Sequence, residues 1–191
     1  IVADQREELL ANDYSELCPR PEESQLDLKS NRAQVVIGVR RCGKSTLCEM
    51  FLMQRGIEFA YVNFDDDRME EMKAGDLDRL LEALYMTYGD FKYLFLDEIQ
   101  NVKGWPLFVN RLLRQKIHLF ITGSNSKLLS KELSTHLTGR NNKVELYPFS
   151  FSEYCTMKKI DTASQSTKAK GLRKSTLHEY LLQGGFPELF N

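Results

Sequence analysis

Residues 38–46 read Gly38-Val39-Arg40-Arg41-Cys42-Gly43-Lys44-Ser45-Thr46, between an apolar run (34–37) and an amphipathic segment (44–55). The glycines, the lysine and the hydroxyl match G-x-x-x-x-G-K-[ST], the phosphate-binding loop (P-loop), in its required place between a strand and a helix. Glycine lets the backbone wrap closely around phosphate, and a helix N-terminus points N–H groups at negative charge. All nine residues are therefore predicted to bind a nucleotide, with an ordinary glycine-rich turn as the alternative.

Individual side chains of this loop predict specific contacts. Lys44 would reach the β- and γ-phosphates, and Ser45 would place its hydroxyl on Mg²⁺. Cys42 borders the phosphates and would be open to alkylation if exposed. Arg40 and Arg41 add positive charge, and they either bind nucleotide or pair with carboxylates. The carboxylates considered are those of Asp65, Asp66, Asp67 and Glu98.

A second motif follows the apolar segment 93–96, which ends in two adjacent carboxylates, Asp97 and Glu98. Open α/β sheets place their ligands at the carboxyl ends of their strands, so this is a Walker B pattern. We expect Asp97 to hold Mg²⁺ opposite Ser45. Glu98 is expected to point to the other side of the strand by alternation, where it would orient or deprotonate an attacking water. The structural alternative is an acidic pair that caps the following loop.

Two further positions are catalytic candidates. The apolar segment 117–122 leads into Gly123-Ser124-Asn125, where Asn125 or Ser124 would hydrogen-bond the γ-phosphate or the water. The same run also suits a turn and a helix N-cap. Arg140 follows a helical segment, and its guanidinium either stabilises charge on a transferring phosphoryl group, in cis or from a neighbouring subunit, or is a surface arginine.

Alternation of apolar β-type runs with helical patterns predicts an α/β fold with a mostly parallel, five-stranded sheet. Strands are expected at residues 34–37, 58–64, 93–96, 117–122 and 143–146, and helices at 44–55, 76–85, 105–115 and 127–137. In the third helix Trp105, Phe108, Val109 and Leu112 share one face, which indicates core packing.

The chain divides into three regions. Residues 1–31 predict a helical lead-in (5–14) and a Pro-containing loop, residues 32–154 the P-loop domain, and residues 155–191 a basic linker with the start of a truncated helical region. The stretch 156–176 has many lysines, one acid and no aromatic residue, so it is expected to be a solvated linker or mobile loop rather than a nucleic-acid surface. Because the sequence begins at Ile1 and stops just after an apolar-rich segment, we expect it to be part of a longer polypeptide.

Composition narrows the function classes. With 42% hydrophobic and 28% charged residues the chain is of ordinary globular composition, and a net charge of -1 provides no global attraction to nucleic acid or anionic membrane. No apolar run approaches the ~18 residues of a membrane span and no signal peptide is evident, so a cytoplasmic protein without a membrane partner is expected. The four cysteines show no C-x-x-C pairing and are expected to be reduced thiols.

Six segments together resemble a known family, the prokaryotic, largely uncharacterised AAA-type ATPases whose P-loop domain is usually followed by a C-terminal domain of unknown function. The segments are residues 38–46, 93–102, 121–126 and 137–140, with the closing pieces 146–154 and 184–188. The resemblance covers most of residues 33–190. It implies a three-layer P-loop fold of the additional-strand, catalytic-glutamate type, with the P-loop strand central in the sheet. It also implies ATP with Mg²⁺, and an arginine-finger-like position for Arg140.

The leading hypothesis is an enzyme that hydrolyses ATP with Mg²⁺. Glu98 and Asn125 would position the water, while Lys44, Ser45 and Asp97 would hold the phosphates and the metal. A second hypothesis is a nucleotide-operated switch that hydrolyses little and acts on a protein or DNA partner through segments outside this sequence. A P-loop kinase is a third, disfavoured by the glutamate directly after Asp97. A homo-oligomer stays open.

Overall fold

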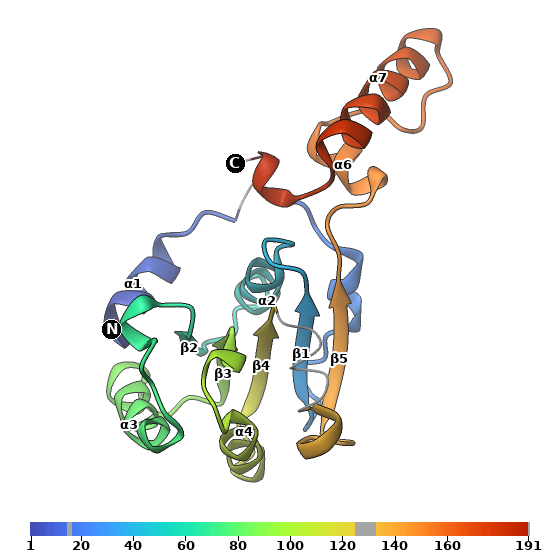
Figure 1. Cartoon of the computed structure of the whole chain (residues 1–191). Helices are drawn as coiled ribbons and strands as arrows, with labels where there is room; N and C mark the ends of the chain where they lie inside the picture. The colour runs from blue at the N-terminus through green and yellow to red at the C-terminus, as the bar shows by residue number, and fades with distance from the viewer. Residues whose placement is uncertain (15–16, 125–132, 191) are drawn as a thin grey trace.

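A parallel sheet forms the centre of the computed structural model, which describes residues 1–14, 17–124 and 133–190 (Figure 1). The strands are β1 (Ala33–Gly38), β2 (Ala60–Asn63), β3 (Tyr93–Asp97), β4 (His118–Gly123) and β5 (Asn141–Leu146). Their order is β2-β3-β4-β1-β5, and every neighbouring pair is parallel. The P-loop strand β1 therefore lies inside the sheet, between β4 and β5, as the resemblance implied.

Helices cover both faces of this sheet. The described helices are α1 (Val2–Ala11), α2 (Lys44–Met53), α3 (Leu77–Tyr88), α4 (Trp105–Arg114), α6 (Phe151–Met157) and α7 (Thr167–Gln183), of which α6 and α7 lie away from the faces of the sheet. In Figure 1, α2 lies on one side of the strands, and α3 and α4 lie on the other. The three-layer α/β prediction is confirmed.

Strand alternation explains why the core has two parts. Val35 and Ile37 of β1 face the cluster under α3 and α4, whereas Val36 faces the cluster under α2. Successive side chains of a strand point to opposite faces, so a strand buried on both sides is apolar throughout. The predicted stripe on α4 is core, with Trp105 and Leu112 almost fully buried.

The ends of the elements differ from expectation by a few residues. The lead-in helix α1 begins at Val2 rather than at residue 5, and α3 continues to Tyr88, three residues beyond the expected end. The expected strand at 58–64 shortens to β2 (Ala60–Asn63). Most of the helix expected at 127–137 lies outside the described residues, and residues 133–136 are helical.

The prediction of a linker at 156–176 is wrong for its second half, because α7 begins at Thr167. The Ser166 side chain accepts a hydrogen bond from the Ala169 N–H and caps this helix. Lysine, leucine and arginine are good helix formers, so a basic stretch without aromatic residues is no obstacle to a helix. Helices α6 and α7 pack together and project from the sheet, and residues 184–190 then return toward the P-loop (Figure 1).

Among the described residues, no helix is both long and apolar enough to cross a bilayer. All four cysteines are buried free thiols, in line with the prediction from their spacing.

Helix α2 carries a buried carboxyl, Glu49, whose protonation state affects the stability of the fold. Glu49 is 7% exposed and accepts a hydrogen bond from Tyr14 Oη at 2.9 Å. Burial raises its pKa from 4.5 to about 7, and the nearby Asp97 charge adds to that rise. Above pH 7 the folded protein must therefore hold a buried charge that the unfolded chain would expose to water.

The sign of the effect follows from the raised pKa. The protonated Glu49 carboxyl adds its full contribution to the free energy of unfolding below about pH 4.5, and this contribution is lost as the pH rises through about 7. We expect Glu49→Gln to raise the free energy of unfolding at pH 8 by on the order of 3 kcal/mol, and by much less at pH 5. Urea unfolding at both pH values measures this, and an equal change at the two would contradict it.

Candidate nucleotide site

The P-loop connects β1 to α2 and wraps the start of the helix. Arg41 and Gly43 have positive φ angles of 66° and 91°, and the turn they form brings the N-terminus of α2 under the loop. Gly38 packs so closely on β5 that a Cβ there would lie 2.1 Å from the Leu146 carbonyl oxygen. Gly43 is therefore required by the shape of the loop, and Gly38 by the contact of the loop with β5.

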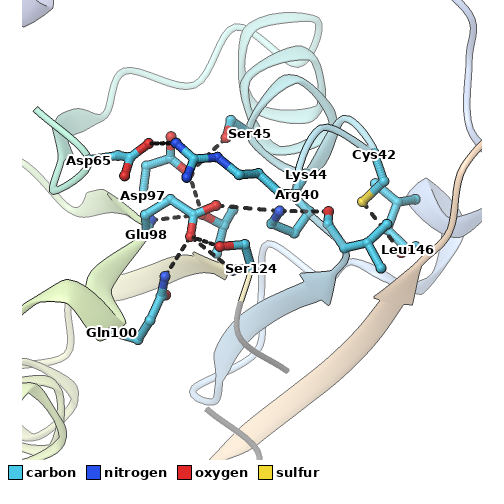
Figure 2. Close-up of polar contacts among 12 residues, drawn as sticks. Arg40, Cys42, Lys44, Ser45, Asp65, Asp97, Glu98, Gln100, Ser124 and Leu146 are labelled. Carbon is cyan, nitrogen blue, oxygen red and sulfur yellow. Dashed lines mark hydrogen bonds and ion pairs between the residues drawn. The ribbon is translucent and has the colours of Figure 1, made fainter. Parts of the chain in front are cut away.

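Ser45 and Asp97 lie in contact at the carboxyl end of the sheet strands. The Ser45 hydroxyl, in the first turn of α2, donates to Asp97 Oδ1 at 2.8 Å (Figure 2). Thr122 of β4 also donates to Asp97 Oδ1, and Asp97 is only 4% exposed. Burial raises the pKa of Asp97 to about 6, although both hydroxyl donors favour its ionised form. The hydroxyl and carboxylate predicted to hold Mg²⁺ are therefore side by side.

Strand alternation predicted that Glu98 points to the other side of the strand, and this prediction is wrong. Strand β3 ends at Asp97, and Glu98 adopts a left-handed conformation (φ 52°) that turns its carboxylate back toward the P-loop. Glu98 Oε1 lies 3.4 Å from Lys44 Nζ. Its Oε2 accepts from the backbone N–H and the hydroxyl of Ser124, both at 2.8 Å, and from Gln100 Nε2 at 2.6 Å (Figure 2).

The surroundings of Glu98 favour its charged form. Burial by itself would raise the pKa of this carboxyl, but the Gln100 hydrogen bond, the Lys44 charge and the Ser124 donors together lower it. Lys44 is 4% exposed and also donates to the Val39 carbonyl at 3.1 Å. The site thus contains an ionised glutamate and a lysine that satisfy each other.

Both loop arginines pair with carboxylates. Arg40 Nη2 lies 2.8 Å from Asp65 Oδ2, one of the four carboxylates considered from the sequence. Arg41 Nη1 lies 3.0 Å from Glu188 Oε2, in the returning C-terminal segment, which was not considered. Sequence alone gave no reason to choose Glu188, because it is far away along the chain.

Cys42 and Thr46 complete the loop. Cys42 is fully buried, with Sγ 3.4 Å from the Leu146 carbonyl oxygen, and burial raises the pKa of its thiol. It therefore lacks the exposure that alkylation requires. Thr46 and Gly43 border a cavity whose lining is mostly apolar. Its lining includes Tyr14, Leu17, Met50, Phe149 and Phe190.

A family model described as "AAA domain" matches residues 30–155, which is most of the chain. The protein belongs to the AAA domain family. An uncharacterized protein of Methanocaldococcus jannaschii is 39% identical over 167 residues, covering 86% of this chain and 38% of that protein. An uncharacterized protein of Haemophilus influenzae is 37% identical over 164 residues, covering 82% and 40%. The chain thus spans about two fifths of these relatives.

Solved structures share the fold of this AAA domain. A Walker-type ATPase of Pyrococcus abyssi matches with a TM-score of 0.54 and 17% identity, over 93% of this chain and 66% of that one. A signal transduction ATPase with a tetratricopeptide repeat sensor, from Pyrococcus horikoshii, matches with a TM-score of 0.54 and 15% identity, over 94% and 30%. These matches describe no C-terminal domain for this chain, so that part of the resemblance stays a prediction.

Of the predicted catalytic residues, Arg140 does not lie at the P-loop of the AAA domain. Asn125 lies outside the described residues. Arg140 precedes β5, whose far end, Leu146, pairs with Gly38. At about 3.3 Å per residue, Arg140 is roughly 20 Å from the P-loop edge of the sheet. Its Nη1 donates to Asn110 Oδ1 at 2.9 Å. A role in cis is therefore incompatible with this structure, and a role in trans stays a prediction.

Sequence reasoning missed four residues that make contacts at the site of this AAA domain. Thr122 donates to Asp97 and accepts the Glu98 N–H, Gln100 holds Glu98, Glu188 pairs with Arg41, and Arg20 donates to the Cys42 carbonyl. The position of Thr122, one residue before the Gly123-Ser124 run at the end of β4, was an available signal, because parallel strand ends meet at one edge. The other three offered no local pattern.

Proposed function

We propose that this AAA domain binds ATP with Mg²⁺ and hydrolyses it. The observation that carries the proposal is the 2.8 Å contact between Ser45 and Asp97 at the mouth of the P-loop, with the Glu98 carboxylate 3.4 Å from Lys44. A hydroxyl, two carboxylates and a lysine around a phosphate-binding loop are the groups that phosphoryl transfer to water needs.

The residues present fit a magnesium ion. Mg²⁺ prefers hard oxygen ligands, and the Ser45 hydroxyl and the Asp97 carboxylate are of that kind. Asp97 would hold the ion, and Thr122 would keep its carboxylate oriented through the hydrogen bond that it donates. When bound, Mg²⁺ would supply positive charge against the phosphate oxygens.

The phosphates and the purine base of ATP would occupy two adjoining cavities. Lys44, Ser45, Asp97 and Glu98 line a polar cavity, which suits the phosphate chain. Gly43 and Thr46 border both this cavity and the apolar one lined by Tyr14, Met50 and Phe190, which suits a purine base.

Hydrolysis would depend on an exchange of partners at Lys44. In the structure Lys44 pairs with Glu98, and a bound β- or γ-phosphate would compete for the same ammonium group. Glu98, ionised and released from Lys44, would then accept a hydrogen bond from a water and take its proton as it attacks. The Ser124 and Gln100 donors would keep the carboxylate in place.

The first experiment is ATP hydrolysis by the wild type with Mg²⁺ and with a chelator, beside Asp97→Asn. We expect turnover to need Mg²⁺, and Asp97→Asn to lose most of the gain that Mg²⁺ gives. Asp78→Asn is the matched control, since Asp78 forms an ion pair with Arg111 on the exposed side of α3. Turnover equal with and without Mg²⁺ would contradict the proposal.

A nucleotide-operated switch with little hydrolysis is the second candidate. It is favoured by the three residues that hold Glu98, which are Lys44, Gln100 and Ser124, and by the Arg41–Glu188 pair, which connects the P-loop to the C-terminal segment. Nucleotide binding that broke this pair would free residues 184–190 to act on a protein or DNA partner. Tight nucleotide affinity with slow turnover would favour the switch over the enzyme.

A homo-oligomer would give Arg140 a role in trans. Arg140 lies just before β5, at the end of that strand opposite to the P-loop. Its guanidinium would therefore reach only the site of a neighbouring subunit. We expect the specific ATPase activity of the wild type to rise with protein concentration and that of Arg140→Ala to stay low throughout. A flat specific activity across dilution would remove the role in trans. Arg114→Ala on α4 is the control.

A further inference from the structure

Arg20 is a buried arginine behind the P-loop. It is 8% exposed and lies in the N-terminal segment, outside every motif discussed so far. Its Nε lies 2.6 Å from Glu153 Oε1 of α6, and its Cζ lies 4.9 Å from the centroid of the Phe149 ring. Burying a guanidinium is costly unless it is paired, and a well-paired one holds its surroundings in one arrangement.

The other two nitrogens of Arg20 reach main-chain carbonyls. Nη1 donates to the Cys42 carbonyl at 3.2 Å, and Nη2 donates to the Tyr147 carbonyl at 2.7 Å. The planar fork of one guanidinium thus joins the P-loop to the end of β5. Cys42 strengthens the same junction from the loop side, since its Sγ lies 3.4 Å from the Leu146 carbonyl oxygen.

The hydrogen bond from Arg20 to the Cys42 carbonyl determines how the Cys42–Gly43 peptide group is oriented. In a planar trans peptide the C=O and the N–H point in opposite directions, and the described residues contain no cis peptide bond. Because Arg20 holds the Cys42 carbonyl on one side, the Gly43 N–H points away from Arg20. Gly43 is the N-cap of α2 and borders the polar cavity that Lys44 and Ser45 line.

We propose that Arg20 is a positioning residue for phosphate binding, which acts by holding the Cys42–Gly43 peptide with its N–H directed at the phosphate chain. A free peptide could rotate and present its carbonyl oxygen, which repels phosphate. The inference rests on the proposed function, because it concerns the same phosphate site. Through Glu153, Arg20 also connects helix α6 to the phosphate loop.

The test is Arg20→Lys. Lysine keeps the positive charge beside Glu153, but a single ammonium cannot reproduce the fork that joins Cys42 and Tyr147. We expect the affinities for ATP and for inorganic tripolyphosphate to fall by the same factor, roughly tenfold. In hydrolysis, KM should rise by a similar factor with kcat within about twofold, as for lost uniform binding.

Arg55→Lys is the matched control. Arg55 also pairs with a glutamate (Glu23, 2.8 Å), donates to a carbonyl (Phe51, 3.0 Å) and lies over a ring, but at the far end of α2. We expect it to bind both ligands like the wild type. A role in folding alone would lower the melting temperature of Arg20→Lys and leave the affinity of the folded protein unchanged, which would overturn the proposal.

A measurement on the wild type keeps the proposal testable if Arg20→Lys does not fold. The amide proton of Gly43 should shift downfield in the NMR spectrum when tripolyphosphate binds, and an unmoved resonance in the saturated protein would overturn the proposal. A wild type that binds neither ATP nor tripolyphosphate would overturn the proposed function and this inference together. Binding by the wild type with equal binding by Arg20→Lys would overturn this inference alone.

Discussion

Glu98→Gln is expected to lower ATP turnover by on the order of 10²-fold or more while ATP binding is kept. Glutamine preserves the size of the side chain and an oxygen that accepts from Ser124 and Gln100, but it lacks the charge that attracts a proton. The variant also removes the carboxylate that competes with phosphate for Lys44, 3.4 Å away. We therefore expect its ATP affinity to equal or exceed that of the wild type.

Steady-state hydrolysis and titration calorimetry on the same preparation separate these two effects. Glu145→Gln is the matched control, because Glu145 also pairs with a lysine, Lys143 at 2.7 Å, but on the exposed surface of β5. It should change neither quantity. A parallel loss of binding and turnover in Glu98→Gln would assign Glu98 a structural role in the site instead of a catalytic one.

Lys44→Ala is expected to abolish ATP binding or to weaken it at least tenfold, which corresponds to about 1.4 kcal/mol or more. Lys44 is the buried cation of the polar cavity and lies beside both the P-loop carbonyl of Val39 and Glu98. Its removal takes away the attraction for the phosphates. It also leaves the Glu98 carboxylate uncompensated next to the position that the phosphates would occupy, and like charges repel.

Calorimetry measures the affinity, and thermal unfolding checks that the variant is folded. Lys143→Ala removes an exposed lysine with a similar ion pair and should bind ATP normally. Unchanged ATP affinity in a folded Lys44→Ala protein would contradict the assignment of residues 38–46 as a nucleotide site. Together with Glu98→Gln, the variant separates loss of binding from loss of chemistry.

Local sequence was sufficient to predict the elements that form the candidate nucleotide site. The strand before residue 38, the helix after Lys44 and the strand ending at Asp97 were all predicted within a few residues. Each has a short-range cause: apolar runs of strand length, a glycine-rich turn, and carboxylates directly after a buried strand. The basic segment after α6 shows the limit of such reasoning, since composition suggested a linker where Ser166 caps a helix that begins at Thr167.

The sequence by itself determined the α/β class, through the alternation of strand-like and helical patterns, and it named the candidate residues. These are the loop 38–46 for phosphate, from a glycine-rich turn between strand and helix, and Ser45 and Asp97 for the metal, from their places in two local motifs. Only the tertiary structure decided where Glu98 points, which carboxylates pair with the loop arginines, and that Arg140 lies at the opposite edge from its own P-loop. The pairing of Arg41 with Glu188 and of Arg20 with Glu153 joins segments more than a hundred residues apart. Such contacts are selected by burial and by charge pairing when the chain is compact, and no local pattern encodes them.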